Sequence, residues 1–130
     1  MMVLEDEIPA AVLRFLEENI DTVPQLETLL LMNRAPDRSW LVAEVAAHNY
    51  ITEQRAEDVL QALLRRDLVT ADESPPRFRF NPATAQIRDL VQELARCYQT
   101  NLSRITTFIH SKPSVSVKEF ARAFDFKKDR

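Results

Sequence analysis

The hydrophobic pattern of residues 39–80 constrains the fold most strongly, because its period changes from helical to extended within a short length of chain. Apolar residues first recur at intervals of three and four positions, which is typical of helices with one buried face. These residues are Val45, Ala46, Ala56, Val59, Leu60, Leu63 and Leu64. The segment from Arg77 to Phe80 then alternates strictly, so both Phe side chains should lie on one face of a strand and both Arg side chains on the other. We therefore expect two helices followed by a strand.

Turn and cap signals separate the two helices. The first helix, residues 42–49, should end at a turn made by Tyr50 and Ile51, with Ile51 pointing inwards. Thr52 can cap the second helix, residues 53–66, because its hydroxyl can accept a hydrogen bond from an unpaired amide of the first turn. An acid at Glu53 favours the positive end of that helix. A tight helix-turn-helix is the expected result.

Short extended segments flank this pair of helices. Residues 39–41 predict a strand in which Trp40 covers the core, and residues 68–71 and 77–80 predict a hairpin. The turn between the hairpin strands contains Pro75 and Pro76. A strand, two helices and a hairpin in this order predict a winged helix-turn-helix over residues 39–81, with the hairpin as the wing.

The rest of the chain is expected to be helical and to complete a single, mainly α domain. Residues 1–38 predict two amphipathic N-terminal helices, the second of which Asp21 or Thr22 can cap. Residues 82–111 predict one long helix, and residues 112–130 predict a short amphipathic C-terminal helix with a basic tail. The β-hairpin wing is the main extended element of this predicted architecture.

The long helix carries apolar residues at alternating spacings of four and three, as in a coiled-coil seam. The seam residues are Ile87, Val91, Leu94, Tyr98, Asn101, Ile105 and Phe108. One expectation is that this seam makes a homodimer, since two-fold dimers are common among soluble chains. The other is that the helix packs across the N-terminal helices of its own chain.

The C-terminal segment carries a large apolar surface on one side of its predicted helix. Val117, Phe120 and Phe124 should share a face there. We expect this face to dock on the domain or on a partner subunit. Insertion into a membrane surface or a partner's groove is the alternative.

Composition argues against an enzyme and against bound cofactors or metals. The chain has no glycine, so it lacks the glycine-rich loops that hold nucleotide phosphates. Cys97 is the single cysteine, and His48 and His110 are the only histidines, so no zinc-ligand spacing occurs. We therefore expect no catalytic residues, no cofactor and no metal.

Charge and hydropathy predict a cytoplasmic protein without a membrane segment. The first residues include Glu5, Asp6 and Glu7 and lack the positive region of a signal peptide. The longest aliphatic run, residues 29–32, is far too short to span a bilayer. The net charge of −3 lacks the basic footprint that non-specific phosphate binding requires.

Residues 39–80 resemble the winged helix-turn-helix of bacterial transcription regulators of the MarR and PadR kinds. The resemblance lies in Trp40, Val45-Ala46, Ile51-Thr52, Val59, Leu63 and Asp67-Leu68-Val69. Such regulators commonly have glycine at the position of Asp67, which implies a helix end with positive φ. The chain also resembles a group of uncharacterised small bacterial proteins, through residues 20–27 and 120–124. The first resemblance implies a fold, and neither fixes a function.

The surface that would carry a function is chemically mixed. The expected recognition-helix surface comprises Thr52, Glu53, Gln54, Arg55, Glu57, Asp58 and Gln61, and the wing adds Arg77 and Arg79. Three acids within two turns oppose a polyanion, which favours a regulatory winged helix that binds a protein. The alternative is sequence-specific binding of a DNA duplex, because Gln54 can read adenine and Arg55 can read guanine.

Overall fold

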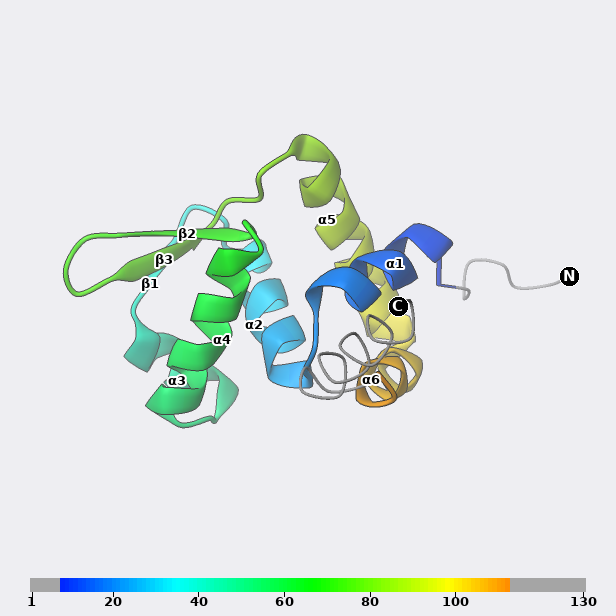
Figure 1. The fold of residues 1–130 in the computed structure, drawn as a ribbon, viewed down its shortest axis with the longest axis horizontal. Coiled ribbons are helices and arrows are strands. Elements are labelled where there is room, and N and C mark those ends of the chain that lie inside the picture. The colour runs from blue at the N-terminus through cyan, green and yellow to red at the C-terminus, as the bar shows by residue number, and fades with distance from the viewer. Residues whose placement is uncertain (1–7, 113–130) are drawn as a thin grey trace, which may run out of the picture.

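The computed structural model describes residues 8–112. Within them the helices are α1 (Ala10–Asn19), α2 (Val23–Arg34), α3 (Val42–Asn49), α4 (Glu53–Arg65), α5 (Ala85–Thr100) and α6 (Leu102–His110). The strands are β1 (Ser39–Trp40), β2 (Val69–Asp72) and β3 (Arg77–Phe80). The sheet, α3 and α4 lie at one end of the molecule, and α1, α5 and α6 lie at the other, with α2 between them (Figure 1). This is the mainly helical winged helix-turn-helix that the sequence predicts.

The three strands form an antiparallel sheet in the order β1-β3-β2. Trp40 of β1 pairs with Phe78 of β3, and Val69 of β2 pairs with Phe80. These four side chains are buried, so one face of the sheet closes the core. The predicted alternation of the wing and the predicted burial of Trp40 are both confirmed.

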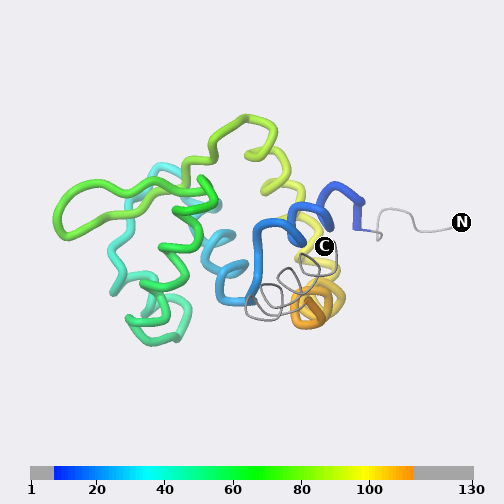
Figure 2. Tube along the Cα trace, viewed as in Figure 1, coloured from blue at the N-terminus to red at the C-terminus, as the bar shows by residue number. Residues whose placement is uncertain are grey.

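Helix α2 is the centre of the fold, as the course of the chain also shows (Figure 2). It contacts α3, α4, α5, α6 and β3. Its buried residues lie around most of the helix and are Leu26, Thr28, Leu29, Leu30, Leu31 and Met32. A helix with buried residues around most of its circumference needs neighbouring elements on most of its sides, and Glu27 marks the side of α2 that is exposed. Helix α2 therefore connects the helix-turn-helix to the C-terminal helices.

The start of α2 is capped by Thr22, one of the two residues predicted for this role. Thr22 Oγ1 accepts a hydrogen bond from the amide of Gln25, at 3.3 Å, which makes Thr22 the N-cap. The side chain of Gln25 accepts in return from the amide of Asp21, at 2.7 Å, rather than from the cap residue itself. Two backbone amides at the corner between α1 and α2 are thereby satisfied.

The expected single helix after Pro82 is wrong, because the chain breaks at Asn101 into α5 and α6. Asn101 leaves helical geometry at φ −130° and ψ 35°. Its side-chain nitrogen donates to the carbonyl of Cys97 at 3.2 Å, and its side-chain oxygen accepts from Arg104 at 3.0 Å. Asparagine side chains that bond to nearby backbone groups compete with continued helix.

The expected intermolecular seam also needs correction, since much of it packs inside the chain. Val91, Leu94, Asn101 and Ile105 are buried. Helix α5 contacts α1 and α2, and α6 contacts α2. Ile87, Tyr98 and Phe108 are partly buried against the same core. This region instead packs across the N-terminal helices of its own chain, which was the alternative expectation. Val117, Phe120 and Phe124 lie outside the described residues.

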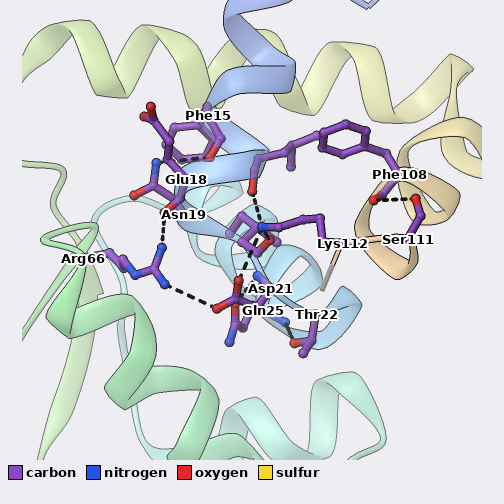
Figure 3. Close-up of polar contacts among 12 residues, drawn as sticks. Phe15, Glu18, Asn19, Asp21, Thr22, Gln25, Arg66, Phe108, Ser111 and Lys112 are labelled. Carbon is purple, nitrogen blue, oxygen red and sulfur yellow. Dashed lines mark hydrogen bonds and ion pairs between the residues drawn. The ribbon is translucent and has the colours of Figure 1, made fainter. Parts of the chain in front are cut away.

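A cluster of charged groups joins three distant parts of the chain (Figure 3). The carboxylate of Asp21 lies between Arg66, at 3.3 Å, and Lys112, at 3.4 Å. The ammonium group of Lys112 also donates to the carbonyls of Leu16, at 2.8 Å, and Ile20, while Arg66 donates to the carbonyl of Glu18. These donors occupy carbonyls at the C-terminal end of α1, where helix carbonyls lack partners within the helix.

Candidate interaction surface on the helix-turn-helix

The turn between α3 and α4 is tight although it contains no glycine. Tyr50 takes the left-handed conformation, with φ 55° and ψ 44°. The amides of Tyr50 and Ile51 both donate to the carbonyl of Ala46, the second at 3.1 Å. Ile51 turns inwards and packs against the core, as predicted. Tyr50 points the other way and is 94% exposed.

The N-terminus of α4 is built as the sequence predicts. The hydroxyl of Thr52 accepts a hydrogen bond from the amide of Arg55 at 3.1 Å. Helix α4 then buries one face against α2 and α3. The buried residues are Ala56, Val59, Leu60 and Leu63. Burial of this face leaves the opposite face of α4 towards solvent, which is the geometry of a recognition helix.

Hydrogen bonds along the helix connect the polar residues of that outer face. Gln54 donates to the carboxylate of Asp58 at 3.1 Å, and Gln61 donates to the carboxylate of Glu57 at 3.1 Å. Gln54 and Asp58 are exposed, and Gln61 and Glu57 are partly buried. Each amide that could read a base thus already donates to an acid one turn away.

The wing presents its two arginines on the side away from the core. Phe78 and Phe80 are buried, whereas Arg79 is exposed and Arg77 is partly exposed. The guanidinium group of Arg77 pairs with the carboxylate of Glu73 at 3.4 Å. Within residues 8–112, Arg79 makes no ion pair.

We define the α4–wing surface as the outer face of α4 together with the wing, which extend from the same end of the molecule (Figure 1). Its acids are Glu53, Glu57, Asp58, Asp72 and Glu73, and its bases are Arg55, Arg77 and Arg79. Carboxylates therefore outnumber guanidinium groups on the predicted recognition-helix surface and the wing taken together. The structure brings these predicted residues to one end of the fold without assigning them a ligand.

Sequence reasoning did not foresee two hollows in the fold. One, of about 640 Å³, lies between the end of α2, the end of β3 and one side of α5, and includes Arg34, Arg88 and Arg96. The other, of about 350 Å³, lies between the start of α2 and the turn at Tyr50. Each hollow joins residues that are far apart in sequence, so no local pattern could have revealed it.

The residues considered for chemistry are in unreactive surroundings. Cys97 is buried, and burial first, then the charge of Glu93, raise the pKa of its thiol, although Arg96 acts in the opposite direction. A raised pKa leaves little of the nucleophilic thiolate. The ring of His48 packs edge-on against Trp40, with ring centres 5.1 Å apart. Among residues 8–112, no group of three or more His, Cys, Asp or Glu side chains could hold a metal ion.

No helix within the described part of the chain is both long enough and apolar enough to cross a membrane.

Comparisons with known proteins give one structural similarity. No protein-family model matches the chain, and no curated protein matches it. Among solved structures, the chain is similar to the structure of a MarR family protein from Bacillus stearothermophilus, with 20% sequence identity and a TM-score of 0.48. The similarity covers 92% of this chain and 81% of that chain. The order and packing of α3, α4 and the three-stranded sheet define the winged helix-turn-helix of this chain.

Proposed function

We propose that this chain is a winged-helix regulatory protein that acts by binding another protein through the α4–wing surface. The observation that carries the proposal is the charge of that surface, where Glu53, Glu57 and Asp58 stand on the helix that faces solvent. A basic protein surface would complement these acids and would be attracted to them over a distance of about 10 Å at moderate salt.

The positions of the polar groups on α4 support this choice of partner. DNA binding draws most of its affinity from neutralised phosphates, and acids close to the groove oppose it. Gln54 and Gln61, the amides best suited to adenine, donate to Asp58 and Glu57 instead. A protein partner can use the same carboxylates directly as hydrogen-bond acceptors for its lysines and arginines.

A second candidate function is sequence-specific binding of a DNA duplex, and the exposed arginines favour it. Arg55, in the first turn of α4, and Arg79, on the wing, make no ion pair within the described residues. In a winged helix these are the positions from which a base edge and a flanking phosphate can be reached. Arginine pairs with guanine through two parallel hydrogen bonds.

Paired charge variants separate the two functions. The purified chain is mixed with randomised duplexes at low salt, and in parallel it is used to capture protein from its source cells. Under the protein proposal, Glu57→Lys and Asp58→Lys abolish capture of a partner that Arg55→Ala and Arg79→Ala still retain. Retarded duplexes whose binding disappears in Arg55→Ala and Arg79→Ala, and falls steeply with salt, would establish the DNA candidate instead.

The proposal includes a homodimer through the outer sides of the C-terminal helices. Leu102 is 54% exposed, and Phe108 of the same helix is partly exposed and lines a shallow hollow with Ser103, Arg104 and Thr107. Exposed apolar surface of this kind is often an interaction site. Light scattering after gel filtration is expected to give twice the chain mass, and Leu102→Lys to give the monomer. A monomeric mass for the unchanged protein would end this part of the proposal.

A further inference from the structure

The turn of the helix-turn-helix presents an aromatic ring beside a hollow. Tyr50 is 94% exposed and forms one wall of the hollow of about 350 Å³. Val23 and Pro24, from the start of α2, and Ile51, from the turn, provide apolar surface within it. Val23 and Ile51 also pack against the core, which makes that surface rigid. Tyrosine gives a large contact area at low entropic cost, which is why it is frequent at interfaces.

A carboxylate at the edge of the hollow is fixed in place by a neighbouring helix. Glu27 lines the hollow, and its Oε2 atom accepts a hydrogen bond from the hydroxyl of Tyr98 at 2.6 Å. Hydrogen bonds to ionised acceptors are short and strong. The second oxygen of Glu27 accepts no hydrogen bond from residues 8–112. Glu27 is therefore held in place through one carboxylate oxygen, and its other oxygen accepts from no donor in the described part of the chain.

An amide on the other side of the hollow is also fixed. Asn49 donates its side-chain nitrogen to the hydroxyl of Thr28 at 2.9 Å, and Thr28 is fully buried in α2. The side-chain oxygen of Asn49 has no donor within the described part of the chain. His48, which also lines the hollow, keeps its ring against Trp40. The hollow therefore combines apolar surface, the exposed ring of Tyr50 and two oxygen acceptors that no donor within residues 8–112 reaches.

We propose that this hollow binds an arginine side chain of a protein partner. The aliphatic stem lies over Val23, Pro24 and Ile51, and the guanidinium group lies against the ring of Tyr50. Its planar fork of donors reaches the carboxylate of Glu27 and the amide oxygen of Asn49. Arginine fits better than lysine, because guanidinium stacks on aromatic rings and donates several hydrogen bonds in one plane.

This inference deepens the proposed function and rests on it for the source of the arginine. The hollow adjoins the N-terminus of α4, where Thr52 and Arg55 line a smaller hollow on the other side of Tyr50 and Ile51. The acids of α4, beginning with Glu53, then continue along the helix. A basic protein segment could place one arginine in the hollow and direct further cations towards Glu57 and Asp58.

The test uses a small probe and needs no identified partner. The full chain, labelled with ¹⁵N, is titrated with N-acetyl-arginine amide and, separately, with its uncharged isostere N-acetyl-citrulline amide. We expect saturable shifts of amide resonances at residues 23, 25–27 and 48–52 with the arginine compound alone. Glu27→Gln and Tyr50→Asn should each weaken binding by about tenfold, since each removes a charged or aromatic contact.

Matched controls separate a site from general attraction to an acidic protein. Asparagine tolerates the left-handed conformation of residue 50, so Tyr50→Asn removes the ring without demanding a new backbone. Glu17→Gln makes the same change as Glu27→Gln at an exposed position of α1 and should leave the affinity unchanged. Equal shifts with citrulline, equal loss in Glu17→Gln, or no shifts around the hollow would each overturn the inference.

The experiments distinguish a wrong arginine site from a wrong proposed function. If the hollow does not bind N-acetyl-arginine amide, but Glu57→Lys still abolishes capture of the protein partner, only the arginine site is overturned. Arginine binding that is lost in Glu27→Gln supports the site even if capture of protein does not depend on the acids of α4. That second result overturns the proposed function and leaves the hollow as a binding site for guanidinium groups.

Discussion

Oδ2 of Asp21 lies 3.3 Å from a guanidinium nitrogen of Arg66, which connects the corner between α1 and α2 to the C-terminal end of α4. The same carboxylate meets Lys112, whose side chain is only 4% exposed (Figure 3). The outer face of α4 is therefore oriented partly by residues that precede and follow the helix-turn-helix.

Replacement of Asp21 tests this cluster. Asp21→Asn keeps the size of the side chain but leaves the buried ammonium of Lys112 without this opposite charge. We expect the free energy of unfolding to fall by about 1–3 kcal/mol, because a buried charge deprived of its partner is strongly destabilising. Urea denaturation followed by circular dichroism measures the change. Glu17→Gln, at an exposed site, should stay within about 0.5 kcal/mol of the unchanged protein. A midpoint for Asp21→Asn no lower than that of this control would contradict the structural role.

The hydrogen bond between Tyr98 and Glu27 predicts a dependence of stability on alkaline pH. Burial first, and then the hydrogen bond and charge of Glu27, raise the pKa of Tyr98 above its ordinary value of 10.0. The folded state thus holds this proton more tightly than the unfolded state, so the contribution is complete below about pH 10 and is lost as pH rises through the folded pKa. Tyr98→Phe removes this component and should lower stability at neutral pH by about 0.5–1.5 kcal/mol.

Urea denaturation of both proteins between neutral and alkaline pH measures the Tyr98 component. The difference in unfolding free energy between them should be constant up to about pH 10 and then shrink by up to about 1.4 kcal/mol per pH unit. The comparison cancels the titration of groups that both proteins share. A difference that stays constant across the whole range would show that the hydroxyl of Tyr98 is not held as described.

The left-handed residue that ends α4 predicts opposite effects for two substitutions. Asp67 has φ 60°, and its amide donates to the carbonyl of Leu64 at 3.1 Å. Asp67→Gly should raise the unfolding free energy by about 0.5–1 kcal/mol, whereas Asp67→Val should lower it by about 1–2 kcal/mol, because only glycine accepts this conformation freely. Thermal and urea unfolding check both values. Thr70→Val, on the exposed side of β2, is the control and should change little. Two shifts of the same sign would refute the assigned geometry.

The surroundings of Cys97 predict a slow thiol. Burial raises the pKa of Cys97 above its ordinary value of 9.0, so at pH 8 the folded protein contains less thiolate than a free cysteine. Reaction with an aromatic disulfide reagent at pH 8 should be at least about tenfold slower than that of free cysteine. Denaturant should restore the ordinary rate. A fast reaction in the folded protein would instead indicate an accessible, activated thiol.

Local sequence patterns predicted the elements that depend on neighbouring residues. The cap at Thr52, the turn at Tyr50 and Ile51 and the alternation of the wing each depend on residues within a few positions of one another. Backbone amides at a helix start need nearby acceptors, and a strand alternates its side chains between two faces, so such signals are legible in the chain itself. The positive φ expected at Asp67, which stands where similar regulators commonly have glycine, also depends on neighbouring residues, and it is confirmed.

Contacts between distant residues decided the rest. The spacing of Val91, Leu94 and Ile105 identified an apolar face but could not say whether a second copy or the chain's own α1 and α2 would cover it. The helix breaks at Asn101, where the side chain bonds to the nearby carbonyl of Cys97 and so competes with continued helix. The spacing of apolar residues does not report this competition.

By itself, then, the sequence determined the winged helix-turn-helix and the residues on its outer face. The tertiary structure alone decided how α2 joins the two ends of the fold, and how Asp21 meets Lys112 across 91 positions. It also decided that Tyr50 and Glu27 border one hollow. The reason is physical: periodicity reports which side of an element is apolar, while the identity of the surface that covers it depends on how the whole chain packs.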